Sequence, residues 1–301
     1  MENLIFILVL LALGKLSRKI PAFDENTANV LNQFVIYLSF PATVFLKING
    51  LKLETGLLVL AVVPWVLVFL SIISVRLISR ALGWDKRLEG AVLLSVALGN
   101  TSFFGFPAVS AFFGDHNLGY AIIYDQLGTF FALSVFGTIV VSVYGSGSSA
   151  SAGGIVKKIM SFPPFLALLC GFVLIRAEFP PVLVTLLEGL SATLVPLVIF
   201  SVGSQLRFNQ PLSNVLPIGI ILLLKMIVSP VIAFAILAVT GIRGDIFQVC
   251  IFEAAMPPMV MAGILAVTGN LRGEIATAAI GYGILLSFVT LPLLYLLLSM
   301  A

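Results

Sequence analysis

Charged side chains are scarce in this sequence. They account for 10% of its 301 residues, whereas hydrophobic residues account for 60%. In a soluble domain about a quarter of the residues are charged, and no soluble core could bury an apolar fraction of this size. The composition therefore predicts a polytopic membrane protein that lies in a lipid bilayer.

Histidine and cysteine are also nearly missing, which argues against an enzyme or a metalloprotein. The single histidine, His116, cannot build a metal site by itself, and Cys170 and Cys250 both lie inside apolar runs. An intramembrane hydrolase would need a nucleophile with a base, or paired aspartates. We expect no enzyme, no catalytic residue, no metal and no cofactor, with Na⁺ or H⁺ entering only as a coupling ion.

Two classes of motif are absent as well. The sequence has no Gly-x-x-x-x-Gly-Lys-Ser/Thr phosphate loop, so we do not expect the chain to be driven by a nucleoside triphosphate. It also has no basic run interleaved with aromatic residues, and its net charge is only +3. Nucleic acid is therefore not expected as a partner.

Apolar runs long enough to span a membrane fill most of the chain. With about 20 residues per span, they predict an all-α fold of about ten transmembrane helices. A Gly/Ser-rich segment, 145–156, is typical of a linker and separates five-helix halves at 1–144 and 157–301. The expected spans are 3–20, 26–47, 55–82, 86–113, 118–144, 159–177, 181–206, 212–240, 244–268 and 274–299.

Prolines recur at corresponding places in the two halves. Three pairs are separated by 155, 153 and 150 residues. Because each half has an odd number of spans, the second half must enter the membrane from the opposite side. The predicted repeat is therefore inverted, as in several transporter folds. The pairs are Pro41 with Pro196, Pro64 with Pro217, and Pro107 with Pro257.

Lysine and arginine are distributed unequally between the two sides of the membrane. Eleven lie on the side of the loop that joins the first two spans, four lie on the other side, and Lys225 lies within a span. The positive-inside rule places the richer side in the cytoplasm. We therefore expect a protein of the cell (inner) membrane with both termini extracytoplasmic. The four are Lys47, Lys52, Arg176 and Arg243, and the eleven include Arg18, Arg76, Arg80, Lys86, Arg87, Arg207 and Arg272.

Helix-breaking residues interrupt two spans, the fourth over 99–107 and the ninth over 253–258. Proline removes a backbone donor, and a break persists at membrane depth only where it lines a cavity or a site. Matching breaks in two halves point to the binding site of a secondary transporter. The alternative is a pair of proline kinks without a ligand. The expected substrate-binding residues are Asn100, Thr101, Ser102, Pro107, Asp125, Met256, Pro257 and Pro258.

Ionisable side chains within spans are costly to bury and therefore indicate function. Glu253 directly precedes the second break, and we expect it to bind a coupling ion together with Asn100 and Asp125. Lys225 is a candidate charge partner of Glu253 or Asp125, or an attractor of an anionic substrate. Glu188 fits an interfacial position better than a site.

Structural alternatives stay open for each of these groups. Glu253 could be a neutral, hydrogen-bonded glutamate, and Asp125 could cap a broken helix. Lys225 could instead extend its ammonium to an interface. The sequence also leaves a homodimer open, because an outward-facing helix rich in glycine and alanine could pair.

Several stretches resemble the auxin efflux carrier family, a group within the wider bile acid/arsenite/riboflavin transporter superfamily. The resemblance covers essentially the whole chain, and its most specific parts are the two breaks. The matching stretches are Phe40-Pro41-Ala42-Thr43-Val44-Phe45, Gly99-Asn100-Thr101-Ser102-Phe103-Phe104-Gly105-Phe106-Pro107, Ala192-Thr193-Leu194-Val195-Pro196-Leu197 with Gly203, Ala254-Ala255-Met256-Pro257 and Ser287-Phe288-Val289-Thr290-Leu291-Pro292-Leu293.

This resemblance implies an architecture and a site. Spans one, two, six and seven would form a panel domain, and spans three to five and eight to ten a core domain that moves against it. Spans four and nine would be broken and would cross, with the substrate between core and panel. In related sodium-coupled bile acid transporters a glutamate of the ninth helix binds the ion, where Glu253 lies here.

The function implied is secondary active transport of small organic anions such as carboxylates, by alternating access with an elevator-type core movement. Coupling to Na⁺ or H⁺, an ion-independent uniporter and a bile-acid-type symporter stay open, and a channel fits less well because no ring of like charges or filter motif is visible. The chain has Gly-Asn-Thr-Ser where plant carriers have Asn-Pro-Asn. This departure favours a short prokaryotic-type member over an auxin carrier.

Overall fold

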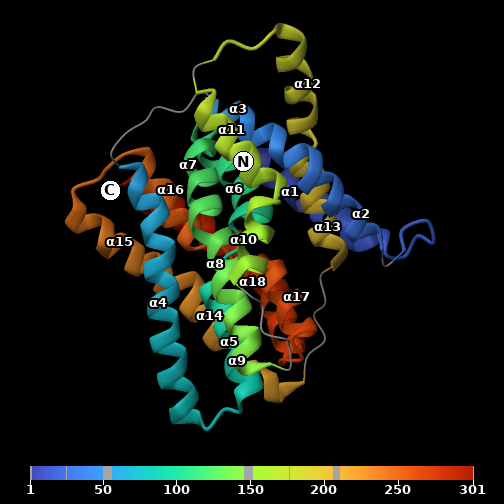
Figure 1. Ribbon diagram of the computed structural model, residues 1–301. Helices are drawn as coiled ribbons and strands as arrows, with labels where there is room; N and C mark the ends of the chain where they lie inside the picture. The colour runs from blue at the N-terminus through green and yellow to red at the C-terminus, as the bar shows by residue number, and fades with distance from the viewer. Residues whose placement is uncertain are drawn as a thin grey trace.

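The protein is helical throughout the part of the chain that its computed structural model describes, residues 2–24, 26–49, 56–145, 152–175, 177–205 and 211–300 (Figure 1). Those residues form no strand, and one isolated antiparallel bridge joins Gly99 to Pro258. Six helices among them are long and apolar enough to cross a membrane. They are Thr27–Asn49, Leu57–Leu82, Asp115–Tyr144, Pro181–Gln205, Val215–Thr240 and Gly273–Ser299.

One set of helices, the first helix group, packs around α13. Helix α1 lies along α13, α2 also contacts α13, and α3 packs against α11 and α12. In Figure 1, α12 projects from the rest of the molecule at one end. The bounds are α1 Glu2–Ser17, α2 Thr27–Phe34, α3 Phe40–Asn49, α11 Pro163–Val173, α12 Pro181–Ala192 and α13 Leu194–Gln205.

Glycines allow α1 and α13 to touch backbone to backbone. A Cβ placed at Gly203 would overlap the carbonyl oxygen of Leu11, and a Cβ at Gly14 would overlap that of Phe200. Close helix approach through small residues is a main source of packing energy in membranes, where lipid is as apolar as the side chains. These two glycines therefore hold the first helix group together.

The helices α4–α9 and α14–α18 form a second helix group. Helix α4 packs on α5 and α16, α14 packs on α18, and α5, α17 and α18 all contact one another. The bounds are α4 Leu57–Leu82, α5 Lys86–Ala97, α6 Phe106–Phe113, α7 Leu118–Ile123, α8 Phe130–Ala132, α9 Thr138–Tyr144, α14 Val215–Leu223, α15 Ser229–Thr240, α16 Asp245–Ala254, α17 Val260–Thr268 and α18 Gly273–Ser299; α10, Ala152–Met160, precedes α11.

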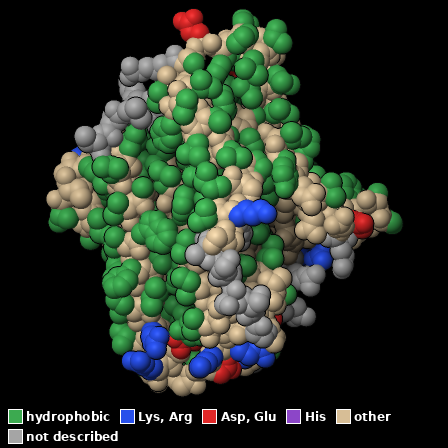
Figure 2. Space-filling view, in the orientation of Figure 1, with side chains coloured by type: hydrophobic (Ala, Val, Ile, Leu, Met, Phe, Trp, Pro, Cys, Tyr) green, Lys and Arg blue, Asp and Glu red, His purple; other side chains and the backbone are tan. Residues whose placement is uncertain are grey.

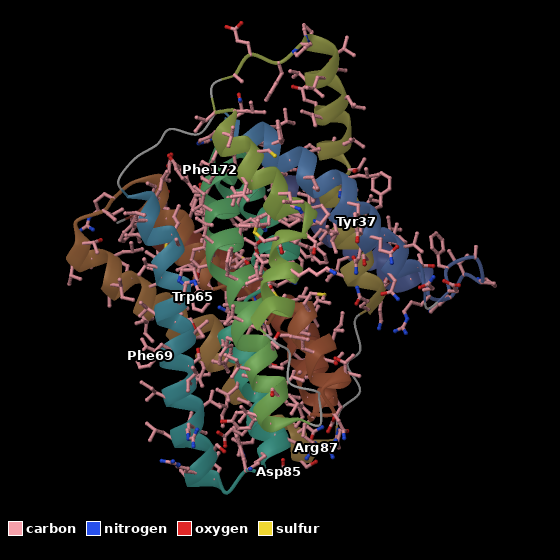
Figure 3. The ribbon with its side chains drawn as sticks, viewed as in Figure 1. Tyr37, Trp65, Phe69, Asp85, Arg87 and Phe172 are labelled. Atoms are coloured by element: carbon pink, nitrogen blue, oxygen red, sulfur yellow. The ribbon has the colours of Figure 1, made fainter. Side chains whose placement is uncertain are left out.

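The hairpin between α4 and α5 marks one end of this group. Gly83 ends α4 with a left-handed φ of 65°, and the Asp85 side chain caps α5 by accepting the Leu88 amide at 2.8 Å. Arg80, Lys86 and Arg87 are exposed there. Figure 2 shows basic side chains gathered at this end below a surface that is mostly hydrophobic. In Figure 3, Trp65 and Phe69 project from α4 well above Asp85 and Arg87, as expected for a lipid-facing helix.

Wide, π-helical turns interrupt several spans. A π turn accommodates an extra residue at a cost in hydrogen-bond geometry, and it often occurs at functional sites. These segments are η1 Val35–Ser39, η2 Thr101–Gly105, η4 Tyr124–Thr129, η5 Leu133–Gly137 and η7 Leu224–Val228; η3 Asp115–Asn117 and η6 Leu212–Asn214 are 3₁₀ turns.

The structure differs from the sequence predictions in three places. The predicted linker 145–156 is helical from Ala152, where α10 begins, and the sixth span ends at Val173 rather than at 177. Pro107 does not break its helix: η2 runs directly into α6, which contains Pro107, and the break falls earlier, at 98–100. Residues 146–151, and the loop cations Lys52, Arg176 and Arg207, lie outside the described residues.

Candidate functional site

The two helix breaks meet at their backbones. The Asn100 amide donates to the Pro257 carbonyl at 2.8 Å, and the Met259 amide donates to the Leu98 carbonyl at 2.9 Å. Pro257 and Pro258 have no N–H, so the second break contains few amides that need a partner. Each remaining amide there has one, because Ala255 and Met256 donate back into α16. The main-chain amides of the second break are thus satisfied within the protein, as membrane depth requires.

Asp125 is held by short hydrogen bonds beside this crossing. Thr101 Oγ1 donates to Asp125 Oδ1 at 2.5 Å, and Gln126 Nε2 donates to Asp125 Oδ2 at 2.6 Å. Asp125 and Thr101 are each 1% exposed, and Gln126 is fully buried. The first break and η4 are therefore joined through one buried carboxyl group, with its two oxygens fixed in direction.

Glu253 is the most unusual side chain of the site. It is fully buried, and neither carboxyl oxygen has a hydrogen-bond partner within the described residues. The carboxyl lies against Gly105, where a Cβ would overlap it. It interacts electrostatically with Asp125 and with Lys225. A buried charge without hydrogen bonds is strongly unfavourable, so this carboxyl group requires a proton or a cation.

Among the described residues, Lys225 provides the positive charge beside the crossing. Its ammonium donates to the carbonyl of Ala254, the last residue of α16, at 3.0 Å, and the side chain is 3% exposed. The sequence left open that Lys225 extends its ammonium to an interface, and the structure shows that it does not. The ammonium instead lies beside Gly99, in the first break.

Three π-helical segments supply these side chains. η2 carries Thr101 and Ser102, η4 carries Asp125, and η7 carries Lys225. Asn100 directly precedes η2 and is 1% exposed, with its amide nitrogen unpartnered within the described residues. The side-chain carbonyl oxygen of Gln126 is likewise unpartnered. Unpaired polar atoms are uncommon in buried regions, and four of the seven found among the described residues belong to Asn100, Gln126 and Glu253.

A cavity of about 600 Å³ lies between the two helix groups. Its lining includes Val260, which directly follows the second break, and the exposed residues Arg18 and Asp24 between α1 and α2. Gln205 of α13 and Thr277 of α18 line it from opposite groups. The cavity therefore connects the surface with the neighbourhood of the crossing.

Residues of α3 contact the chain between 106 and 115, outside the lining of this cavity. The rings of Phe40 in α3 and Phe106 in α6 meet edge to face with centroids 5.0 Å apart, and both are buried. Nearer the surface, Lys47 lies 3.8 Å from Asp115.

A family model described as a membrane transport protein matches residues 1–295. The chain belongs to this membrane transport protein family.

Relatives of the same family match nearly end to end. The chain is 29% identical to an uncharacterised transporter of Methanothermobacter thermautotrophicus over 97% of its own length and 96% of that protein's. It is 30% identical to an uncharacterised transporter of Methanocaldococcus jannaschii, over 93% and 92% of the two lengths. The resemblance to the auxin efflux carrier family is thus confirmed, and this membrane transport protein is a multi-pass membrane protein.

The structure of this membrane transport protein brings most of the predicted site residues together. Asn100, Thr101, Asp125, Lys225 and Glu253 surround the crossing. Glu188 is exposed on α12 and does not join them. The predicted substrate residues Ser102, Met256, Pro257 and Pro258 lie at the breaks, and Pro107 lies within α6.

The sequence indicated Gln126 as a residue that lines the same cavity as Asp125 or hydrogen-bonds across helices, but it did not indicate the cavity residues Arg18, Gln205 and Thr277 as site residues. The signal for Gln126 was its position beside Asp125 in an otherwise apolar run. Polar residues that line a cavity from different spans leave no common spacing in the sequence, so these had no such signal.

Proposed function

We propose that this membrane transport protein is a secondary active transporter of small organic anions, working by alternating access. The observation that carries the proposal is the crossing of two broken helices around the buried, unpartnered carboxyl of Glu253. Broken helices at membrane depth are the usual binding elements of secondary transporters. The half-helix amides suit a carboxylate, and the free oxygens suit a cation.

The coupling ion in this proposal is Na⁺ or H⁺ at Glu253, with Asn100 and Asp125 nearby. Two carboxyl groups and one ammonium give the crossing a net negative charge when all three are ionised. One monovalent cation would neutralise it, which favours co-binding of a cation with the site. An ion-independent uniporter is the second candidate, in which Glu253 keeps its proton throughout the cycle.

Two inverted five-helix repeats are part of the same proposal. Its support includes the antiparallel pairing of the second and seventh predicted spans. Ser39 and Thr193 share a hydrogen bond of 2.6 Å, and Thr43 and Ser191 share one of 2.8 Å. The residue numbers rise on one helix as they fall on the other, as an inverted repeat requires.

The first helix group would be the panel and the second the moving core. The cavity between them, and the Phe40–Phe106 and Lys47–Asp115 contacts outside its lining, fit a state that admits substrate from one side only. The cavity lies on the side of Arg18, which the positive-inside rule assigns to the cytoplasm. In the proposed cycle the core slides along the panel, parting the Phe40–Phe106 contact. A homodimer through the panel is compatible with this arrangement.

Thermal stabilisation by small carboxylates tests the substrate class. A ligand that binds only the folded state raises the melting temperature by mass action. We expect small carboxylates to raise the melting temperature. If Na⁺ is the coupling ion, this rise should disappear when K⁺ or choline replaces Na⁺; if H⁺ is the coupling ion, the rise should depend on pH instead. A rise indifferent to both Na⁺ and pH would favour the uniporter. No rise with any carboxylate would contradict the proposed substrate class and leave the family unaffected.

Cross-linking tests alternating access. In a background lacking Cys170 and Cys250, we expect a Phe40→Cys/Phe106→Cys pair bridged by oxidation or by Hg²⁺ to lose uptake in proportion to the bridged fraction, because the contact must part. Reduction should restore uptake, and either single cysteine should leave it unaffected by the reagent. Full uptake by fully bridged protein would exclude the proposed movement at this contact.

A further inference from the structure

The carbonyl end of α16 is a place where a cation is expected. The last carbonyls of a helix carry partial negative charge and lack intrahelical partners. In α16 the carbonyls of 251–253 accept main-chain amides from residues 255 and 256. The Ala254 carbonyl accepts instead from the Lys225 ammonium at 3.0 Å. A side chain from another span thus supplies the positive charge at this helix end.

The first break makes room for this ammonium. A Cβ at Gly99 would come within 2.9 Å of both Cε and Nζ of Lys225, closer than real Cβ contacts. One broken helix therefore contributes the accepting carbonyl, and the other contributes a residue without a side chain. The lysine is 3% exposed, so it does not share its charge with water.

From these contacts we infer that Lys225 is a built-in cation. Its ammonium permanently occupies a cation position at the crossing that would otherwise require an ion from solution, so the crossing binds one exogenous cation fewer. This inference rests on the proposed coupling role of Glu253. With Lys225 in place, Asp125 and Glu253 leave one negative charge to neutralise; without it they leave two. Because net charge is costly at this depth, the lysine limits the coupling to one cation per cycle.

Removing the side chain should create a binding site for a small ammonium ion. We expect purified Lys225→Ala to melt below the wild type in choline chloride. Methylammonium chloride at equal ionic strength should recover most of the lost melting temperature, with a saturable concentration dependence. The wild type, whose position is filled, should not respond to methylammonium. An unchanged melting temperature in Lys225→Ala, or one insensitive to methylammonium, would overturn the inference.

One glycine variant, compared with a control variant, tests the position of the ammonium without removing its charge. Gly99→Ala should lower the melting temperature, because its methyl group displaces the ammonium from Ala254, and methylammonium should not restore it. The matched control is Gly219→Ala on α14, where a Cβ would meet nothing within 4 Å and no loss is expected. Equal melting temperatures for the two variants would contradict the proposed position of the Lys225 ammonium between Gly99 and the Ala254 carbonyl.

A double variant covers the case in which Lys225→Ala does not fold. Lys225→Met/Glu253→Gln removes one charge of each sign, so we expect it to fold and to melt above either Lys225 single variant. A double variant as unstable as Lys225→Met would show that the lysine acts through packing, which overturns the inference. None of these measurements uses a carboxylate, so they can fail or succeed independently of the proposed substrate class.

Discussion

Replacing Glu253 by glutamine is expected to reduce uptake about tenfold or more. A hydrogen bond or ligand contact to a charged group contributes roughly 1.5–3 kcal/mol, and each 1.4 kcal/mol is about tenfold in affinity. The neutral amide would bind the coupling cation poorly, and Lys225 would lose its counter-charge. Uptake into proteoliposomes of the carboxylate that stabilises the wild type measures this effect.

Glu188→Gln is the matched control for this substitution. Glu188 is exposed on α12, away from the crossing, so the same chemical change should leave uptake within about twofold of the wild type. If Glu253→Gln transports at the wild-type rate and with the same dependence on Na⁺ and pH, the proposed coupling role of Glu253 is wrong.

Replacing Gly203 by valine is expected to destabilise the protein more than any other substitution proposed here. The valine side chain would collide with the Leu11 carbonyl and push α1 away from α13. We expect a loss of about 3 kcal/mol or more, which at roughly 2–4 °C per kcal/mol lowers the melting temperature by about 10 °C. Thermal unfolding of the purified protein in detergent measures it.

Gly189→Val controls for the cost of valine in a helix. A Cβ at Gly189 on α12 meets nothing within 4 Å, so only the small propensity change remains. Similar melting temperatures for Gly203→Val and Gly189→Val would mean that α1 and α13 can separate without loss, contrary to the close packing described above.

The location of the site could be predicted from the sequence because its chemistry is rare there. Few ionisable residues lie in apolar runs, and Glu253 lies next to the only Pro-Pro pair in the ninth span. The burial of Asp125 and Lys225 followed from the same argument. The all-helical fold followed from the length of the apolar runs alone.

Other features left no readable pattern. The π-helical turns that position Asp125 and Lys225 depend on packing between spans, and a shift of one residue in hydrogen bonding does not change hydrophobic periodicity. Pro107 was expected at the break, but the chain unwinds before Thr101 because the bridge to Pro258 forms there. Where the fourth span unwinds thus depends on pairing with the second break, which lies about half the chain away.

The bridge between Gly99 and Pro258 has a consequence for substitutions around the crossing. Its two hydrogen bonds join main-chain atoms, so replacing the Asn100 or Met259 side chain by that of any residue other than proline leaves the donating amides in place. The scaffold of the crossing is thereby insulated from changes in the groups around it. A substitution at Thr101 or Lys225 therefore changes the polar groups around the crossing without removing the main-chain bonds that join the two breaks.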